Sequence, residues 1–66
     1  MKFSERLKEL RQKSPVTQKQ IADELGITVS AYQYYEAGKT EPPLSKLIKL
    51  ADIFAVSLDY LVGRTE

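Results

Sequence analysis

Apolar residues recur at helical spacing along almost the whole chain, and no stretch alternates for long between apolar and polar positions as a strand would. The first such segment predicts a helix over residues 4–13, with Ser4 as its N-cap. Pro15 disfavours helical geometry at Ser14 and so ends the segment. The apolar face, with spacing i, i+4, i+7, consists of Phe3, Leu7 and Leu10.

The second segment has the clearest helix start, because a Thr-x-x-Gln capping box lies inside a hydrophobic staple. These signals come from Val16, Thr17, Gln20 and Ile21. They predict a helix over residues 18–25, which Gly26 ends in a left-handed conformation. The expected buried stripe is Ile21, Ala22 and Leu25. Thr28 then caps a third helix, over residues 29–37, and Ile27 can pack on Tyr32 as a second staple.

The third helix carries three tyrosines, which cannot all face one small core. Its inward face is predicted to hold Ala31, Tyr32 and Tyr35, with the two hydroxyl groups reaching water or a backbone carbonyl. Tyr34 then projects outward. The helix is expected to end at Gly38.

After the loop "KTEPP", two further helices are predicted, over residues 44–54 and 58–62. The apolar stripe expected on the fourth is Leu44, Leu47, Ile48, Ala51 and Phe54. Ser57 caps the fifth helix, with a staple from Val56 to Leu61, and Gly63 ends it. The sequence therefore predicts an all-α fold of five short helices in a single domain, residues 1–66.

The residue types that are missing from the chain exclude several classes of function. The chain has neither His nor Cys, so an imidazole base, a thiol nucleophile and a disulfide are excluded. Asp23 and Glu24 are adjacent and diverge on a helix, and neither a phosphate-binding glycine loop nor a metal-ligand cluster is found. We therefore expect no enzyme, no catalytic or metal site, no cofactor and no small-molecule ligand. No apolar run is long enough to span a membrane, so the cytoplasm is the default location.

Charge is unevenly distributed along a chain whose net charge is only +1. Residues 1–20 carry six basic groups against two acidic ones, whereas the remaining residues carry four against seven. One interpretation is that a basic end approaches phosphates while an acidic end faces away. The other is a helix surface covered by ion pairs at i, i+3 and i, i+4.

A helix, a tight glycine turn and a second capped helix form the helix-turn-helix pattern. Three stretches extend the likeness: "TQKQIADELGIT", "YYEAGKTEPP" and "LIKLADIFAVSLDYLVG". Together they resemble the lambda-repressor-like, Cro-type helix-turn-helix DNA-binding family, along nearly the whole chain from Phe3 to Gly63. The resemblance implies a compact five-helix domain that binds operator DNA, usually as a homodimer, and regulates transcription.

The resemblance also implies roles for individual residues. Gln18 matches a glutamine that binds the DNA backbone and supports a neighbouring reading side chain, and Lys39 matches a phosphate-contacting lysine. Arg11 and Glu36 match a partly buried salt bridge between the first and third helices. The positions at the exposed start and middle of the recognition helix are Thr28, Val29, Ser30, Gln33 and Tyr34.

Three residues depart from the family pattern. Tyr34 stands where Arg or Lys is frequent, which weakens electrostatic attachment, and Val29 stands where many members have a polar reader. Ala55 replaces the usual Gly after the fourth helix; a left-handed conformation there would cost about 1 kcal/mol.

Each candidate reader also has an ordinary surface interpretation. Gln33 can pair with adenine through both amide atoms, and Val29 can pack on a thymine methyl; the alternative for each is a surface residue without a role in binding. Ser30 is short and less selective. Tyr34 can stack on a sugar, donate to a phosphate or touch a base, or it can lie along its own helix.

The leading hypothesis is a sequence-specific transcriptional regulator, most simply a phage or bacterial repressor, that binds the major groove of a pseudo-palindromic operator as a homodimer. The alternative is an antitoxin-like or adaptor module that uses the same fold to bind proteins. Three apolar residues could meet a second copy or simply complete the core of the monomer: Ile53, Leu58 and Val62.

Overall fold

The structure, a computed structural model, describes residues 2–64 of the chain. In this range every regular element is an α-helix. The helices are α1 (Phe3–Gln12), α2 (Gln18–Leu25), α3 (Val29–Ala37), α4 (Leu44–Ile53) and α5 (Leu58–Val62). The predicted all-α class is confirmed, and the helix boundaries differ by at most one residue from those expected. No helix within residues 2–64 is long and apolar enough to cross a membrane.

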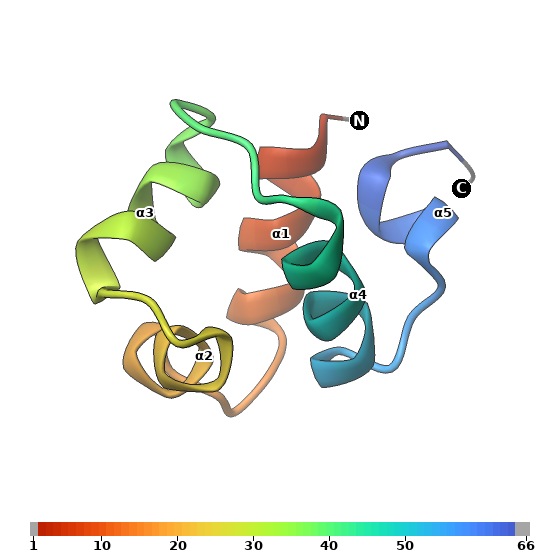
Figure 1. The fold of residues 1–66 in the computed structure, drawn as a ribbon. Coiled ribbons are helices and arrows are strands. Elements are labelled where there is room, and N and C mark those ends of the chain that lie inside the picture. The colour runs from red at the N-terminus through yellow and green to blue at the C-terminus, as the bar shows by residue number, and fades with distance from the viewer. Residues whose placement is uncertain (1, 65–66) are drawn as a thin grey trace.

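The helices are arranged around α1, which lies in the middle of the molecule in Figure 1. On one side, α2 and α3 pack against each other, and α3 also packs on α1. On the other side, α4 contacts α2 and α5, and α5 packs back on α1. One long face of α3 therefore lies at the edge of the molecule, away from α4 and α5.

The start signals in the sequence act as expected in α2, α3 and α5. The hydroxyl oxygens of Thr17, Thr28 and Ser57 each accept a hydrogen bond from the backbone N–H three residues later, at 3.1 Å. In the capping box of α2, Gln20 returns a bond by accepting from the backbone N–H of Thr17 at 2.8 Å. These bonds satisfy donors that a helix start otherwise leaves free, so the predicted starts are confirmed.

Ser4 does not cap the first helix, contrary to expectation. The residue before the helix is Lys2, which has extended backbone angles, and the Glu5 carboxylate accepts its N–H at 3.2 Å. Glu5 in the first turn also suits the positive end of the helix dipole, so the start shifts by one residue. Ser4 lies instead against Gly38, where an added Cβ would come within 3.2 Å of the Ser4 hydroxyl oxygen.

Four helix ends share one geometry, in which a residue one or two positions after the helix is left-handed. At Gly26, Gly38 and Gly63 the φ angles lie between 70° and 85°. The corresponding residue after α4 is Ala55, with φ of 54°, and it is the only non-glycine residue with positive φ in residues 2–64. The N–H of Val56 donates to the carbonyl of Ala51 at 3.0 Å, as the N–H of Ile27 does to Ala22 at the end of α2. The alanine therefore makes the same turn at a conformational cost.

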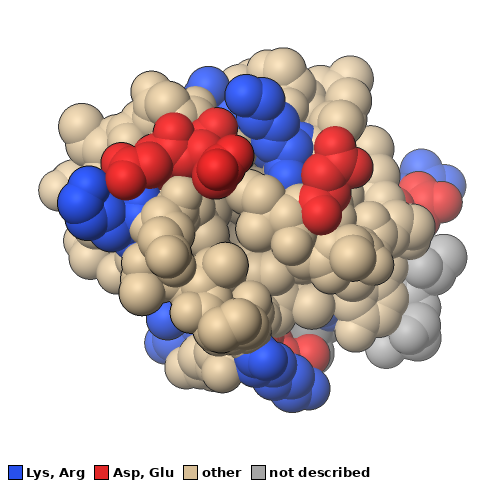
Figure 2. All heavy atoms as spheres, turned by 90° about the horizontal axis from the view of Figure 1, so that it is seen from below, with Lys and Arg blue, Asp and Glu red and all other residues tan. Residues whose placement is uncertain are grey.

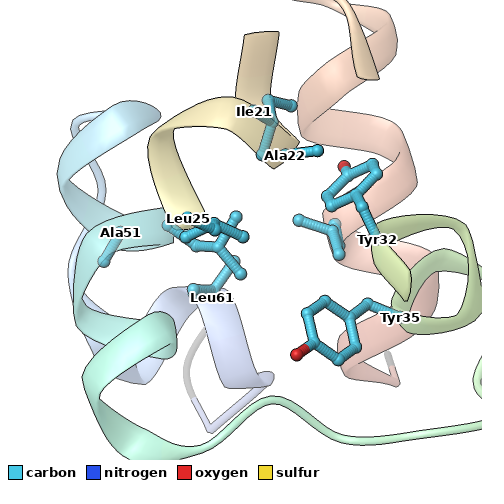
Figure 3. Close-up of a cluster of buried hydrophobic side chains, with 9 residues drawn as sticks. Ile21, Ala22, Leu25, Tyr32, Tyr35, Ala51 and Leu61 are labelled. Carbon is cyan, nitrogen blue, oxygen red and sulfur yellow. The ribbon is translucent and has the colours of Figure 1, made fainter. Parts of the chain in front are cut away.

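The core is built from all five helices. Its two aromatic rings, Tyr32 and Tyr35, come from α3 and meet edge to face, with centroids 6.5 Å apart and planes at 81°. Figure 3 shows their hydroxyl groups pointing away from each other, with Ile21 and Ala22 of α2 beside Tyr32. The buried apolar residues are Leu7, Ile21, Ala22, Leu25, Tyr32, Tyr35, Leu50, Ala51 and Leu61. The inward orientation predicted for Tyr32 and Tyr35 is confirmed.

The predicted stripe of α4 is partly wrong. Leu44 and Ile48 are 61% and 47% exposed, whereas Leu50, which the stripe omitted, is fully buried. The face that packs inward is spaced i, i+3, i+4, i+7 and consists of Leu47, Leu50, Ala51 and Phe54. With apolar residues on two sides of this helix, its periodicity fits two orientations, and contacts with α2 and α5 select one of them.

Candidate nucleic-acid interface

The outer face of α3 presents a row of side chains to solvent. Ser30, Gln33 and Tyr34 are exposed, and so is Thr28, immediately before the helix. Tyr34 is the least covered of the tyrosines in residues 2–64, at 49%. Because Tyr32 and Tyr35 occupy the core, the helix is held by its inner face while its outer face stays open.

An ion pair joins the end of α1 to the end of α3. The Nε atom of Arg11 lies 2.5 Å from Oε2 of Glu36, and Nη2 lies 3.1 Å from Oε1, so the guanidinium contacts both carboxylate oxygens. The Glu36 side chain is only 7% exposed. Geometry of this bidentate kind adds direction to the attraction and fixes α3 relative to α1.

The phenol of Tyr32 completes this cluster by donating to Oε2 of Glu36 at 2.6 Å. Burial raises the pKa of Glu36, but hydrogen bonds from Arg11 and Tyr32 outweigh it and hold that pKa below its ordinary value. The hydrogen bond to Glu36 raises the pKa of Arg11. Burial, and then the bond to Glu36, raise the pKa of Tyr32. At neutral pH the carboxylate is therefore ionised, and the other two groups are protonated.

Two glutamines extend the cluster to the surface. The amide nitrogen Nε2 of Gln18, in the first turn of α2, donates to Oε1 of Glu36 at 3.3 Å. The Nε2 atom of Gln33 donates to Oε1 of Gln18 at 3.0 Å. A continuous series of hydrogen bonds thus runs from the nearly buried Glu36 side chain through Gln18 to Gln33 on the outer face of α3.

Lys39 and Tyr34 form a second, exposed pair at the C-terminal end of α3. The Nζ atom of Lys39 lies 5.5 Å from the centroid of the Tyr34 ring, which is within the range of a cation–π contact. Both side chains are exposed. The ammonium group therefore lies over the ring, next to the start of the loop between α3 and α4.

Val29 is placed differently from the other candidate readers. Its side chain is half-buried and packs against the core, so only part of its surface is available for contact. It borders a hollow of about 700 Å³ whose lining also includes Gln18 and Arg11. Thr28 is likewise engaged, because its hydroxyl oxygen caps α3.

Several of the surface charges form local ion pairs. Lys13 contacts Glu9 at 3.7 Å, and Lys19 contacts Asp23 at 3.1 Å, both at i, i+4 spacing. Figure 2 shows the molecule from below, with groups of both signs around a largely uncharged centre. The ion-pair interpretation therefore describes these residues, and such exposed pairs contribute little to stability.

The three residues considered for a dimer contact are all half-buried: Ile53, Leu58 and Val62. Of these, Ile53 and Leu58 pack against the core of their own chain. On α4, the large apolar residues that solvent reaches most are Leu44 and Ile48. The DNA candidates thus come from α2, α3 and the residues next to α3, whereas the dimer candidates come from α4 and α5.

Several functional contacts were not anticipated from the sequence. The Tyr32 hydroxyl reaches a carboxylate, not water or a carbonyl as expected; the i, i+4 spacing of Tyr32 and Glu36 was the available signal. The Nζ atom of Lys46 donates to the carbonyl of Leu25 at 3.2 Å and thereby ties α4 to the end of α2. The guanidinium of the buried Arg6 lies 3.8 Å from the centroid of Tyr60. No local pattern indicated the last two contacts.

A family model described as Helix-turn-helix matches residues 7–61, which include all of α2, the Gly26 turn and all of α3. The chain belongs to the Cro/C1-type helix-turn-helix family. Its relatives include the cryptic phage CTXphi transcriptional repressor RstR of Vibrio cholerae, which is 44% identical over 64 residues that make up 97% of this chain and 57% of that protein. The regulator ImmR of Bacillus subtilis is 41% identical over 66 residues, or 100% of this chain and 52% of that protein.

Solved structures agree with this assignment. A transcriptional regulator from Listeria innocua superimposes with a TM-score of 0.91 at 37% identity, over 98% of this chain and 61% of that one. The DNA-binding domain of the P22 C2 repressor gives a TM-score of 0.84 at 26% identity, over 100% of this chain and 92% of that one. The chain spans about half the length of the curated relatives it matches.

The chain thus has the fold of this helix-turn-helix family, and the relatives it matches are named as transcriptional regulators and repressors. Of the recognition-helix positions assigned by the resemblance, Thr28 caps α3, and the others lie on this helix, whose outer face is open: Val29, Ser30, Gln33 and Tyr34.

Proposed function

We propose that this chain is a sequence-specific repressor that binds a pseudo-palindromic operator as a homodimer, with the N-terminal half of α3 in the major groove. The observation that carries the proposal is the exposed row on α3, whose Gln33 is held in place by Gln18. A side chain with few accessible conformations loses less entropy when it binds a base. Repression would follow from covering promoter DNA, in the cytoplasm where that DNA is found.

In this proposal some of the exposed side chains contact base edges and determine sequence preference, and others contact phosphates and fix the position of the domain on DNA. Gln33, Ser30 and Tyr34 face base edges, and Val29 offers its exposed part to a thymine methyl. Gln18, Lys39 and the N-terminal end of α3 at Thr28 bind phosphates, which fixes register without reading sequence. The Lys39 ammonium, already placed over the Tyr34 ring, would bind beside that reader.

Selection of bound duplexes from a random DNA pool, followed by affinity measurements on the selected sequence, tests these roles. Gln33→Ala should relax base preference at one position of each half-site. Lys39→Ala should weaken binding to all sequences alike and reduce the salt slope by about 1. The matched control is Lys49→Ala, which removes the same charge from an exposed position of α4 and should leave both quantities unchanged. Unchanged base preference in Gln33→Ala would contradict the reader role.

The dimer is proposed to form through three half-buried residues of α4 and α5: Ile53, Leu58 and Val62. Two half-sites would then lie about 34–36 Å apart, or one helical turn. Sedimentation of the chain with the selected duplex should show two copies per operator. Val62→Lys should reduce this to one copy while the circular dichroism spectrum remains helical; two copies in that variant would exclude this surface.

The exposed Leu44 and Ile48 favour a second candidate function, in which the same fold binds a protein as an antitoxin-like or adaptor subunit. Salt dependence separates the two. DNA binding weakens with salt, with a log–log slope of about −0.9 per phosphate neutralised, whereas an apolar protein contact changes little. A protein partner whose binding requires Leu44 and Ile48, together with a lack of DNA selectivity, would favour this alternative.

A further inference from the structure

Gln18 occupies a position where its amide can have only one orientation. One end faces Oε1 of Glu36 at 3.3 Å, and the other faces Nε2 of Gln33 at 3.0 Å. A glutamine amide has an acceptor at one atom and a donor at the other, so its two ends are not interchangeable. The orientation of Gln18 therefore determines which kind of atom Gln33 meets.

Glu36 determines that orientation because it can only accept hydrogen bonds. Its carboxylate receives donors from Arg11 and Tyr32 at both oxygens, and these donors favour the ionised form. An oxygen of Gln18 placed against this carboxylate would bring two acceptors together, whereas Nε2 supplies a further donor. Gln18 therefore turns Nε2 inward and Oε1 outward.

The same reasoning applies at the next step. Because Gln18 presents an acceptor to α3, Gln33 must turn its Nε2 toward Gln18. Within residues 2–64, Oε1 of Gln33 accepts no hydrogen bond, and one N–H of its Nε2 is not needed by Gln18. The free edge of Gln33 thus carries one acceptor and one donor in a fixed arrangement.

We propose that Glu36, through Gln18, sets the polarity of the reading edge of Gln33 and thereby directs it to adenine. Adenine presents an N6 donor and an N7 acceptor in the major groove, which match Oε1 and the remaining N–H of Gln33. Guanine presents two acceptors, O6 and N7, and would need a second donor where Oε1 lies. Glu36 is nearly buried and so acts as a positioning residue; this inference rests on the proposed entry of Gln33 into the groove.

A measurement on the free chain tests the polarity without DNA. In nuclear Overhauser spectra of the 66-residue protein, the Nε2 protons of Gln18 should lie close to side-chain protons of Arg11 and Tyr32. The Nε2 protons of Gln33 should lie close to the side chain of Gln18. Gln18 amide protons directed toward Gln33 instead would overturn the inference.

A second measurement tests the consequence for reading. In the pool selection, Gln33→Ala should remove the base preference at one position of the half-site. That position is the one read by Gln33. There the unsubstituted chain should prefer adenine over guanine by at least about fivefold, since a bidentate pair discriminates by about 1 kcal/mol or more. Glu36→Gln removes the acceptor-only partner, so both orientations of Gln18 become available. The preference should then fall below about twofold at this one position, while preferences elsewhere persist.

Two controls separate positioning from a general loss of structure. Glu9→Gln makes the same chemical change on the surface of α1, and Val56→Ala removes half-buried apolar volume before α5. Both should leave the adenine preference intact, whatever they do to stability. If circular dichroism shows that Glu36→Gln does not fold, Gln18→Met replaces it as the test. This substitution removes the amide that links Glu36 to Gln33. It should weaken binding to all sites and abolish the preference for adenine at the position read by Gln33.

The outcomes distinguish this inference from the proposed function. An enriched operator whose adenine preference survives Glu36→Gln, or Gln18→Met if that is the variant that folds, overturns the inference and leaves the operator proposal intact. A pool without any enriched sequence overturns both. Loss of adenine preference in the variant, together with the expected proton contacts in the unsubstituted chain, supports the inference.

Discussion

The two sides of this domain are held together by different kinds of contact. Between α1, α2 and α3, one carboxylate collects hydrogen bonds from Arg11, Tyr32 and Gln18. Around α4 and α5 the contacts are mainly apolar, with Leu50 and Leu61 fully buried. Hydrogen bonds fix direction as well as distance, whereas apolar burial is not directional.

This difference in the kind of contact agrees with the function that we propose for each side of the domain. A helix that reads bases must hold its donors and acceptors in one orientation, and the polar cluster does this for α3. The α4 side has to hold the fold together, and it tolerates a left-handed alanine and two exposed aliphatic residues. Specificity would therefore depend on the first side, and stability on both.

The largest expected effect is the loss of the ion pair. Arg11→Ala leaves the nearly buried carboxylate of Glu36 without its main partner, and we expect it to lower the free energy of unfolding by about 3–5 kcal/mol. Urea denaturation followed by circular dichroism measures this. The control is Lys19→Ala, which breaks the exposed pair with Asp23 and should cost about 0.5 kcal/mol or less. If both variants lost the same free energy of unfolding, burial would not explain the contribution of the Arg11–Glu36 pair to stability.

Two aliphatic residues of α4 test the apolar side. Leu50→Ala removes a fully buried side chain and should cost about 2–5 kcal/mol. Ile48→Ala, two residues earlier, removes one that is 47% exposed, and we expect a change within about 0.5 kcal/mol. The same urea titration compares them. A larger cost for Ile48→Ala would mean that the helix packs with the face first expected from the sequence.

Low pH should reduce the stability contributed by the hydrogen bonds of Glu36 between α1, α2 and α3. The pKa of Glu36 is lower in the folded chain than its ordinary value of 4.5, so the unfolded chain binds the proton more tightly. The stability contributed by Glu36 is therefore fully present above about pH 4.5 and is lost as the pH falls through the folded pKa. Urea midpoints measured between pH 7 and pH 3 should decline for this reason.

A matched pair of variants isolates the contribution of Glu36 to that decline. Glu36→Gln should be less stable at pH 7 but should show a flatter dependence on pH. Glu9→Gln, at an exposed ion pair, should keep the slope of the unsubstituted chain. If the slope survives Glu36→Gln, other carboxylates are responsible for the acid sensitivity.

The smallest expected effect is an increase in stability. Ala55→Gly relieves the left-handed strain after α4 and should stabilise the domain by about 1 kcal/mol or less, since glycine also adds freedom to the unfolded chain. One kcal/mol corresponds to a rise in Tm of about 4–8 °C in a domain of this size. The reverse substitution, Gly26→Ala at φ of 70°, should lower the Tm. A lower Tm for Ala55→Gly would show that the turn is not strained.

Much of the fold could be predicted because its signals are local. The caps Thr17, Thr28 and Ser57 and the glycine stops act within one turn of backbone, so their residues alone determine where α2, α3 and α5 begin and end. The start of α1 was misplaced because Ser4 is also a good cap by composition, and only the Glu5 bond to the Lys2 N–H decides between the two. The stripe of α4 was ambiguous for a different reason, since two of its faces are apolar.

The sequence by itself determined five helices, the Gly26 turn and the inward and outward tyrosines, because helix periodicity and capping depend on neighbours within a few residues. Only the tertiary structure decided which face of α4 is buried, and only it brought Glu36, Gln18 and Gln33 into one series of hydrogen bonds. The members of that series are separated by 18 and 15 positions along the chain, so no local pattern relates them. Their hydrogen bonds form only when α2 packs against α3, and that packing is a property of the folded chain.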